Sequence, residues 1–301
     1  MEEKQMLSFD GRVAVVTGSG RGLGASHAKF LASRGAAVVI NDLGGSAQGT
    51  GASATPAEEV VAEIVAAGGR AVANFDSVTE NPEAIVQTAI DAFGRLDILV
   101  NNAGINQARP FGPDVLPSIR QHMEVHFFGT AGVTAAAWPH LVQSGSGRIV
   151  NTTSPTLIGF PQQTPYVSAK GAIFAFTRTL ALEGAEVGIK VNAIAPTAAT
   201  RMSDEADISE EFKQFMRDNL PTSLVSPVVA YLAHQDCAIN GEVLQAQGGE
   251  VQRLVLGFNT GFTSTDLTPE LIQQHLAEIL DPATHVPFEQ VDKQDLGAVG
   301  K

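Results

Sequence analysis

The sequence has few of the residues that several classes of protein depend on. It contains one cysteine, Cys237, and 19 Lys plus Arg against 32 Asp plus Glu, which gives a net charge of −13. A single cysteine excludes an internal disulfide and a multi-cysteine zinc site, so we interpret Cys237 as a core residue of a protein from a reducing compartment. The acidic balance excludes a nucleic-acid partner, because such binding draws its affinity from Lys and Arg at phosphates.

Long apolar runs are also missing. No window reaches the roughly 18 apolar residues of a membrane span, and the start, MEEKQMLSFDGR, is charged where a signal peptide is apolar. The last residues, AVGK, match no peroxisomal or endoplasmic-reticulum targeting signal. We therefore expect a soluble, cytoplasmic protein with no membrane insertion. Its 301 residues are enough to bury a sizeable core without stabilising disulfides or metal ions.

Short apolar runs rich in β-branched residues alternate with longer segments of helical spacing. Strands that are apolar throughout are buried on both faces, which predicts a parallel sheet with helices on each side. The predicted fold class is therefore α/β, a doubly wound parallel sheet of the Rossmann type. The predicted strands are Val13 to Thr17, Ala37 to Asn41, Ala71 to Asn74, Ile98 to Val100, Arg148 to Thr152 and Ile189 to Ala195.

The segments between the strands predict helices and one loop of unusual composition. Ala57 to Ala67 and Glu83 to Phe93 have helical spacing, and each is followed by a glycine that closes the helix. Gly44 to Thr55, GGSAQGTGASAT, is low in complexity and is expected to be a mobile loop. Because it follows a strand, it should lie on the ligand side of the sheet.

The alternation of strand and helix stops after about Ala246. We predict a single catalytic domain, residues 1–256, followed by a C-terminal appendage, residues 257–301. The appendage contains one predicted helix, ELIQQHLAEIL, with Thr268 as its N-cap and proline in its first position. It has too little apolar material for an independent core, so we expect it to pack on the main domain or on another subunit.

Glycines crowd the turn between the first strand and the first predicted helix. Such a turn lets the backbone approach a pyrophosphate, whose charge the helix N-terminus stabilises. The alternative is a tight turn without a ligand. The candidate cofactor-binding residues here are Gly18, Ser19, Arg21, Gly22, Leu23 and Gly24.

Two charged residues bear on which dinucleotide would bind. Asp42 ends the second strand about 20 residues beyond the glycines, where a carboxylate can accept hydrogen bonds from adenosine ribose hydroxyls. Arg21 points the other way, because its guanidinium can pair with a 2′-phosphate. We favour NAD over NADP, since a phosphate beside Asp42 would face a like charge. Loop capping by Asp42 and plain solvation of Arg21 are the alternatives.

The segment Tyr166-Val167-Ser168-Ala169-Lys170 places a phenol and an ammonium group four residues apart. This spacing places Tyr166 and Lys170 on one face of a predicted helix. A nearby Lys⁺ stabilises a phenolate and is expected to lower the pKa of Tyr166, which makes this residue a candidate proton donor and acceptor for an alcohol or a carbonyl. An exposed Tyr and Lys pair without function is the alternative.

With the glycine turn, the sequence Asn101-Asn102-Ala103-Gly104 and Ser154 after the fifth strand, residues 9 to 250 resemble the short-chain dehydrogenase/reductase family. The resemblance implies that Tyr166 is the general acid/base, that Lys170 holds the nicotinamide ribose and tunes Tyr166, and that Ser154 hydrogen-bonds the reacting oxygen. It also implies the remaining cofactor contacts, which are Asp76, Ser77, Asn102, Ala103, Gly104, Pro196 and Thr197.

Two positions depart from the family pattern. Ser154 stands 12 residues before Tyr166 where the family usually shows 13, a spacing that points to Thr153. We prefer Ser154 and place a one-residue deletion in the following loop. His126 stands where most of the family has an asparagine whose backbone anchors a water on the lysine proton path. Histidine can relay protons near neutral pH, so His126 is a catalytic candidate, with a structural role as the alternative.

His126, VVINDLGG and NAIAPTAATRM are similar to one branch, the (3R)-hydroxyacyl-CoA dehydrogenase domain of peroxisomal multifunctional enzyme type 2, also called 17β-hydroxysteroid dehydrogenase type 4. The resemblance implies oxidation of a (3R)-3-hydroxyacyl-CoA, with a hydroxysteroid or steroid-derived acyl-CoA as the alternative substrate. It also implies a homodimer or homotetramer, either standing alone or working with a separate hydratase. A non-catalytic NAD-binding protein is the alternative from another class.

Overall fold

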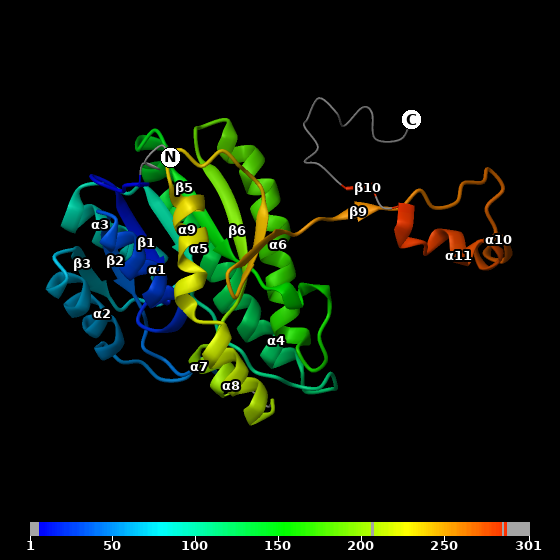
Figure 1. The fold of residues 1–301 in the computed structure, drawn as a ribbon, viewed down its shortest axis with the longest axis horizontal. Helices are drawn as coiled ribbons and strands as arrows, with labels where there is room; N and C mark the ends of the chain where they lie inside the picture. The colour runs from blue at the N-terminus through cyan, green and yellow to red at the C-terminus, as the bar shows by residue number, and fades with distance from the viewer. Residues whose placement is uncertain (1–5, 206–207, 285, 288–301) are drawn as a thin grey trace. The chain divides into compact units, whose positions relative to one another are not determined.

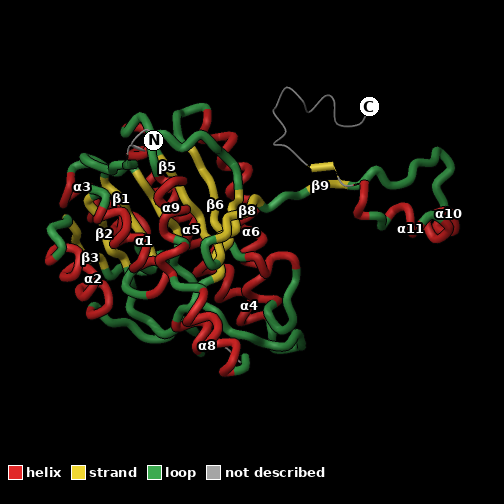
Figure 2. Tube along the Cα trace, in the orientation of Figure 1, coloured by secondary structure: helices red, strands yellow, loops and turns green. Residues whose placement is uncertain are grey.

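The computed structural model describes residues 6–205, 208–284 and 286–287. The chain divides into two compact units, residues 1–252 and residues 253–301. Figures 1 and 2 show the first unit as a twisted sheet with helices packed on both of its faces. Among the helices of the described residues, none is long and apolar enough to cross a membrane.

The first unit is built on one sheet of eight strands in the order β3-β2-β1-β4-β5-β6-β7-β8. The pairings from β3 through to β7 are all parallel. Strands β1, β2, β4 and β5 are buried along their whole length, as their apolar runs predict. The predicted doubly wound parallel sheet is therefore confirmed. The strands are β1 (Val13–Thr17), β2 (Ala37–Asn41), β3 (Arg70–Asn74), β4 (Ile98–Asn101), β5 (Arg148–Thr152), β6 (Lys190–Thr197), β7 (Val243–Gln247) and β8 (Glu250–Arg253).

Helices cover both faces because alternate side chains of a strand point to opposite sides of the sheet. Ala14 and Val16 of β1 pack in one core with residues of α1, α2 and α9, whereas Val13 and Val15 pack in a second core with residues of α3, α5 and α6. The helices are α1 (Gly22–Ser33), α2 (Thr55–Ala66), α3 (Pro82–Phe93), α4 (Leu116–His122), α5 (Gly129–Gln143), α6 (Thr164–Ala185), α7 (Arg201–Asp204), α8 (Glu210–Asn219) and α9 (Ser226–Ala233).

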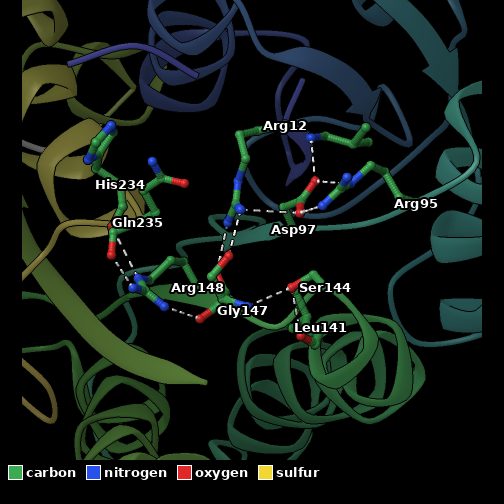
Figure 3. Close-up of polar contacts among 11 residues, drawn as sticks. Arg12, Arg95, Asp97, Leu141, Ser144, Gly147, Arg148, His234 and Gln235 are labelled. Carbon is green, nitrogen blue, oxygen red and sulfur yellow. Dashed lines mark hydrogen bonds and ion pairs between the residues drawn. The ribbon is translucent and has the colours of Figure 1, made fainter. Parts of the chain in front are cut away.

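A cluster of charged side chains ties the strands together at the amino edge of the sheet (Figure 3). Asp97, which is buried just before β4, accepts hydrogen bonds from the Val13 amide at 2.8 Å and from the Arg95 guanidinium at 2.6 and 2.9 Å. Arg12 lies 3.5 Å from the same carboxylate. Arg148 of β5 donates to two backbone carbonyls in the segment after α9. This amino-edge clamp fixes the end of the sheet that lies opposite the predicted ligand side.

The described part of the second unit pairs β9 (Gly257–Phe258) antiparallel with β10 (Val286–Pro287) and forms two short helices, α10 (Pro269–Gln274) and α11 (Leu276–Ile279). Thr268 caps α10 as predicted, and its hydroxyl accepts the Leu271 amide at 3.2 Å. The prediction of one continuous helix is wrong. The helix breaks at His275, whose ring stacks on Phe262 with 3.8 Å between centroids. Among the described residues of this unit, no apolar side chain is buried.

Candidate active site

The glycine turn lies between β1 and α1, at the carboxyl edge of the sheet. Gly18 and Gly22 have φ values of 61° and 54°, in the left-handed region that favours glycine. A Cβ atom at Gly18 would lie 2.7 Å from the Cα atom of Ala103, and one at Gly24 would lie 2.2 Å from the Gly18 carbonyl oxygen. Side chains at these positions would collide with the chain's own atoms. Glycine therefore lets the segment after β4 and the first turn of α1 pack closely against this turn, which lies at the N-terminus of α1, where an anion can bind.

The other predicted residues of this turn divide into supporting and exposed positions. The buried Ser19 donates its hydroxyl hydrogen to the Val16 carbonyl at 2.7 Å, and Leu23 packs against the hydrophobic core on the α1 side of the sheet. Arg21 precedes α1 with an extended backbone and is exposed. Ser19 and Leu23 therefore hold the shape of the turn, whereas Arg21 presents its guanidinium to solvent.

The ends of β2 and β3 carry the predicted adenosine-side residues. The Asp42 carboxylate accepts hydrogen bonds from the backbone amides of Gly20 and Gly44, each at 2.7 Å. Asp76 accepts a hydrogen bond from the last side chain of β3 at 2.7 Å, and the Ser77 hydroxyl lies 2.9 Å from that of its neighbour Thr79. Asp42 is thus fixed directly against the glycine turn, while Asp76 and Ser77 follow the next strand of the sheet.

The segment after β4 is joined to the same turn. The amides of Asn102 and Ala103 donate to the Thr17 hydroxyl at 3.0 and 3.1 Å, and the Asn102 side chain donates to the Thr17 carbonyl at 3.0 Å. A Cβ atom at Gly104 would lie 2.4 Å from the His126 ring. Asn102 and Ala103 therefore support the turn by their hydrogen bonds, and Gly104 leaves room for the histidine.

Tyr166 and Lys170 lie one turn apart at the start of α6, as their spacing predicts. The Lys170 ammonium nitrogen is 5.5 Å from the centroid of the Tyr166 ring and donates to the Thr152 carbonyl at 2.7 Å. Ser154, which is buried just after β5, lies near enough to Tyr166 for its side chain to lower the pKa of the phenol. The structure thus brings the three predicted catalytic side chains together at the carboxyl edge of the sheet.

Two adjacent hydroxyls compete for the serine position of the family pattern. The Thr153 hydroxyl donates to the backbone carbonyl of Lys170 at 2.8 Å and is 1% exposed. The Ser154 hydroxyl accepts the Thr156 amide at 3.2 Å and contacts Tyr166. Thr153 therefore faces the backbone of α6, and Ser154 is the hydroxyl that reaches the phenol.

The expectation that Lys170 lowers the pKa of Tyr166 is wrong for this structure. Burial raises the pKa of the Tyr166 phenol above 10.0, and the hydrogen bond with Ser154 opposes this effect only in part. Burial also lowers the pKa of the Lys170 ammonium from 10.5 to about 7. Near neutral pH the lysine is therefore only partly charged, and the loss of solvation outweighs its attraction for a phenolate.

His126 lies in a π-helical turn, Met123–Phe128, that joins α4 to α5. Such turns occur frequently at functional sites. The His126 ring meets the Tyr166 ring edge to face, with 5.4 Å between centroids. Its Nε2 atom lies 2.7 Å from the Ile105 carbonyl oxygen and therefore donates to it, so Nδ1 is left as a buried acceptor with no hydrogen-bond partner among the described residues. Burial and the charge of Lys170 hold the pKa of His126 well below 6.5.

The remaining predicted positions lie along the same edge. Pro196 and Thr197 are the last residues of β6, and both are half-buried beside β7. The expected mobile loop is tied to other segments instead. Its Ala47 carbonyl accepts the Asn106 amide at 3.0 Å, and its Gly45 carbonyl accepts a hydrogen bond from Arg201 at 3.1 Å. The backbone carbonyls of this glycine-rich loop accept hydrogen bonds from residues elsewhere in the chain. The composition of the loop alone does not predict these partners.

Two groups of residues at this site were not among the residues predicted from the sequence. Asn41 of β2 donates to the Asn74 side chain at 2.8 Å, and Asn101 of β4 donates to the Asn151 side chain at 2.9 Å. The available signal was that four predicted strands have asparagine at or next to their carboxyl ends. His122 is the second omission. Its ring stacks on that of His126 with 5.9 Å between centroids, and the spacing of four residues was the available signal.

Comparisons with known proteins identify the family. A family model described as short chain dehydrogenase matches residues 12–211. A Mycobacterium tuberculosis protein named as a short-chain type dehydrogenase/reductase is 45% identical over 281 residues, 92% of this chain and 96% of that protein. A 7α-hydroxysteroid dehydrogenase solved with NADH and 7-oxo glycochenodeoxycholic acid matches with a TM-score of 0.73 and 30% identity, covering 84% of this chain and 99% of that one.

Peroxisomal multifunctional enzyme type 2 of Drosophila melanogaster is a further relative. It is 42% identical over 249 residues, 82% of this chain and 41% of that enzyme. Its full-length structure matches with a TM-score of 0.78 and 31% identity, covering 97% of this chain and 49% of that one. The chain thus spans about half or less of that enzyme. From the family match and these similarities, we conclude that the chain is an oxidoreductase acting on a CH–OH group and belongs to the short-chain dehydrogenase family.

Proposed function

We propose that the protein interconverts a secondary alcohol and a ketone with a nicotinamide dinucleotide, using Tyr166, Ser154 and Lys170. The observation that carries this proposal is the position of the buried Lys170 ammonium, 5.5 Å from the centroid of the Tyr166 ring, with Ser154 near enough to lower the pKa of the phenol. A phenolate beside a hydroxyl can take up the proton of an alcohol, and the resulting phenol can return it in the reverse reaction. The glycine turn lies at the same edge of the sheet, where α/β folds bind their ligands.

The residues at this edge fit a dinucleotide. The glycine turn lies at the N-terminus of α1, which suits a pyrophosphate. The Asp42 carboxylate, held by two amides, suits ribose hydroxyls and disfavours a 2′-phosphate, so we propose NAD rather than NADP. Arg21 is the feature that favours NADP. The residues proposed to hold the rest of the cofactor are Asp76, Ser77, Asn102, Ala103, Gly104, Tyr166, Lys170, Pro196 and Thr197.

In this mechanism the bound nicotinamide supplies the acceptor for a hydride from the alcohol carbon. Tyr166 takes the hydroxyl proton, and Ser154 holds the reacting oxygen by a hydrogen bond. Lys170 favours the phenolate when it is protonated. His126 stays neutral because its pKa is held low, so we assign it to fixing the Ile105 carbonyl beside the phenol ring rather than to storing a proton.

We propose a (3R)-3-hydroxyacyl-CoA as the substrate, on the similarity to peroxisomal multifunctional enzyme type 2. The loop between Ser154 and Tyr166 exposes Ile158 and Phe160, which are 86% and 58% accessible and suit a bulky apolar group. A hydroxysteroid is the second candidate, because the 7α-hydroxysteroid dehydrogenase shares the fold and was solved with an oxidised bile acid conjugate. The net charge of −13 gives no long-range attraction to the phosphates of CoA.

The test is a panel of acyl-CoA and steroid alcohols assayed with NAD and with NADP, following reduced cofactor by absorbance. Tyr166→Phe should lower kcat/KM by on the order of 10²- to 10⁴-fold while dinucleotide binding persists. The matched control is Tyr231→Phe, since Tyr231 is the only other tyrosine and lies on α9. If wild type and Tyr166→Phe both bind dinucleotide and neither turns over any alcohol, the protein is a non-catalytic binding protein.

We further propose that the protein works as a homodimer or homotetramer in the cytoplasm. The helices α5 and α6 expose Val142 and Leu182, which are 38% and 41% accessible, as a subunit interface would require. The lone Cys237 is buried and has no second cysteine to pair with, which fits a reducing compartment. Light scattering of the purified chain at several concentrations tests the assembly, and a monomer throughout would contradict it.

A further inference from the structure

The backbone of residues 105–107, which follows the Asn102 segment, is held on one side by the two histidines of the α4 region. His126 donates to the Ile105 carbonyl at 2.7 Å. The His122 Nδ1 atom lies 2.8 Å from the Ser118 carbonyl and donates to it, which leaves Nε2 to accept the Gln107 amide at 3.2 Å. Both rings are 0–1% exposed. Residues 105–107 are therefore fixed against the helix that faces Tyr166.

Residues 105–107 are also bonded to the loop of residues 43–54. The Asn106 amide donates to the Ala47 carbonyl at 3.0 Å, and Ala47 is 4% exposed. The Gln48 carbonyl accepts the side-chain amides of Gln107 at 3.2 Å and of Gln121 at 3.4 Å. A Cβ atom at Gly49 would lie 2.9 Å from Ile105. The loop is thus packed and hydrogen-bonded to a segment beyond the neighbouring strand.

The same loop is also bonded to the α7 region, which follows β6. Arg201 donates to the Gly45 carbonyl at 3.1 Å, and the Gln48 side chain donates to the Glu205 carboxylate at 2.8 Å. In the sheet, β1 lies between β2 and β4, with β6 farther along the same side as β4. A loop that leaves β2 and bonds to the segments after β4 and β6 therefore crosses the end of β1, where the glycine turn lies. Figure 1 shows this loop in blue, running from the β2 side toward α7.

We propose that residues 43–54 form a strap over the dinucleotide crevice and that Gln107, Gln121 and His122 are positioning residues that hold it in place. The inference rests on the proposed function, because it takes the crevice to be the dinucleotide site. A dinucleotide under the strap leaves when the hydrogen bonds that hold the strap open, and the two bonds of the Gln48 carbonyl are among them. The two glutamines should therefore set the dissociation rate of the cofactor and leave hydride transfer unchanged, since neither contacts the Tyr166 pair.

The test compares wild type with the double variant Gln107→Met/Gln121→Met, which keeps side-chain length and removes both donors. NADH dissociation is measured by stopped-flow fluorescence with excess NAD⁺ as the chase, and hydride transfer is measured in single turnover with the best alcohol of the panel. Removing two hydrogen bonds should raise the dissociation rate roughly tenfold, while hydride transfer changes less than about twofold. Gln87→Met, on the exposed face of α3, is the control and should change neither rate.

Hydrogen exchange provides a second readout that a loss of folding cannot imitate. In wild type, NADH should slow exchange of peptides covering residues 43–54 and of the Asn106 amide, and the double variant should lose this protection while the core strands keep theirs. Unchanged dissociation and unchanged protection in the variant would overturn the strap, as would an effect confined to hydride transfer. If wild type binds neither dinucleotide, the proposed function fails first, and the strap over a dinucleotide fails with it.

Discussion

Lys170 should make the stability of this protein rise with pH. The pKa of its ammonium is lowered from 10.5 to about 7, and burial is the cause. Between these two values the unfolded chain binds more protons than the folded one, so the free energy of unfolding increases with pH. At 1.36 kcal/mol per pH unit, the interval from about 7 to 10.5 corresponds to about 5 kcal/mol. Below pH 7 the buried lysine therefore lowers the free energy of unfolding by this full amount, about 5 kcal/mol.

Lys170→Met removes the titrating group and also the hydrogen bond to the Thr152 carbonyl. Loss of that bond costs about 2 kcal/mol, because a buried carbonyl is left without a partner. The variant should therefore be more stable than wild type by about 3 kcal/mol at pH 6 and less stable by about 2 kcal/mol above pH 10.5, with the two curves crossing near pH ~9. The same variant should lose turnover.

The assay is guanidinium unfolding of both proteins at intervals from about pH 6 to about pH 11, with the dependence of the unfolding free energy on denaturant checked for equal slopes. Lys190→Met, which removes a lysine hydrogen bond to the Cys237 carbonyl, measures the hydrogen-bond loss at one fixed pH. A stability difference between Lys170→Met and wild type that is independent of pH, or that grows with pH in favour of the variant, would refute the reasoning.

Three further predictions concern the site and the amino edge. Ser154→Ala should lower kcat/KM by about 10²-fold or more and Thr153→Ala by much less, and equal losses in steady-state assays would contradict the assignment of the hydroxyl. Because the pKa of Tyr166 is raised and the phenolate is the form that accepts a proton, kcat/KM for alcohol oxidation should climb from pH 7 toward pH 10; a flat or falling profile counts against Tyr166 as the base. Asp97→Asn should lower the free energy of unfolding by about 3 kcal/mol, read from the denaturant midpoint, with kcat of the folded fraction unchanged.

Much of the fold could be predicted because its strands are buried on both faces. β1, β2 and β5 have the predicted bounds, and all of their residues are buried. The appendage helix could not be predicted as the structure has it, because its helical spacing runs on through His275, where the helix is interrupted and the ring stacks on Phe262. Local spacing carries no record of such a contact.

The candidate site, like the fold, could be predicted from the sequence only in part. The glycine turn and the Tyr166 and Lys170 pair follow from spacing alone, because helix and turn geometry bring those residues together. The direction of the Tyr166 pKa did not follow, since it depends on how far the phenol and Lys170 are buried. His122 was missed because its role depends on Gln107, which arrives from another segment of the chain.

The amino-edge clamp has a consequence for how this protein can be altered. Asp97, Arg12 and Arg148 secure the strands at the edge opposite the glycine turn and Tyr166, and their partners are largely other residues of that edge. Loops at the catalytic edge can therefore accumulate substitutions while the strands stay anchored at their other ends. Libraries aimed at a new alcohol should vary the loop between Ser154 and Tyr166 and leave the clamp untouched. Because the amino edge keeps the strands in place, the loops at the catalytic edge can accept substitutions without loss of the fold.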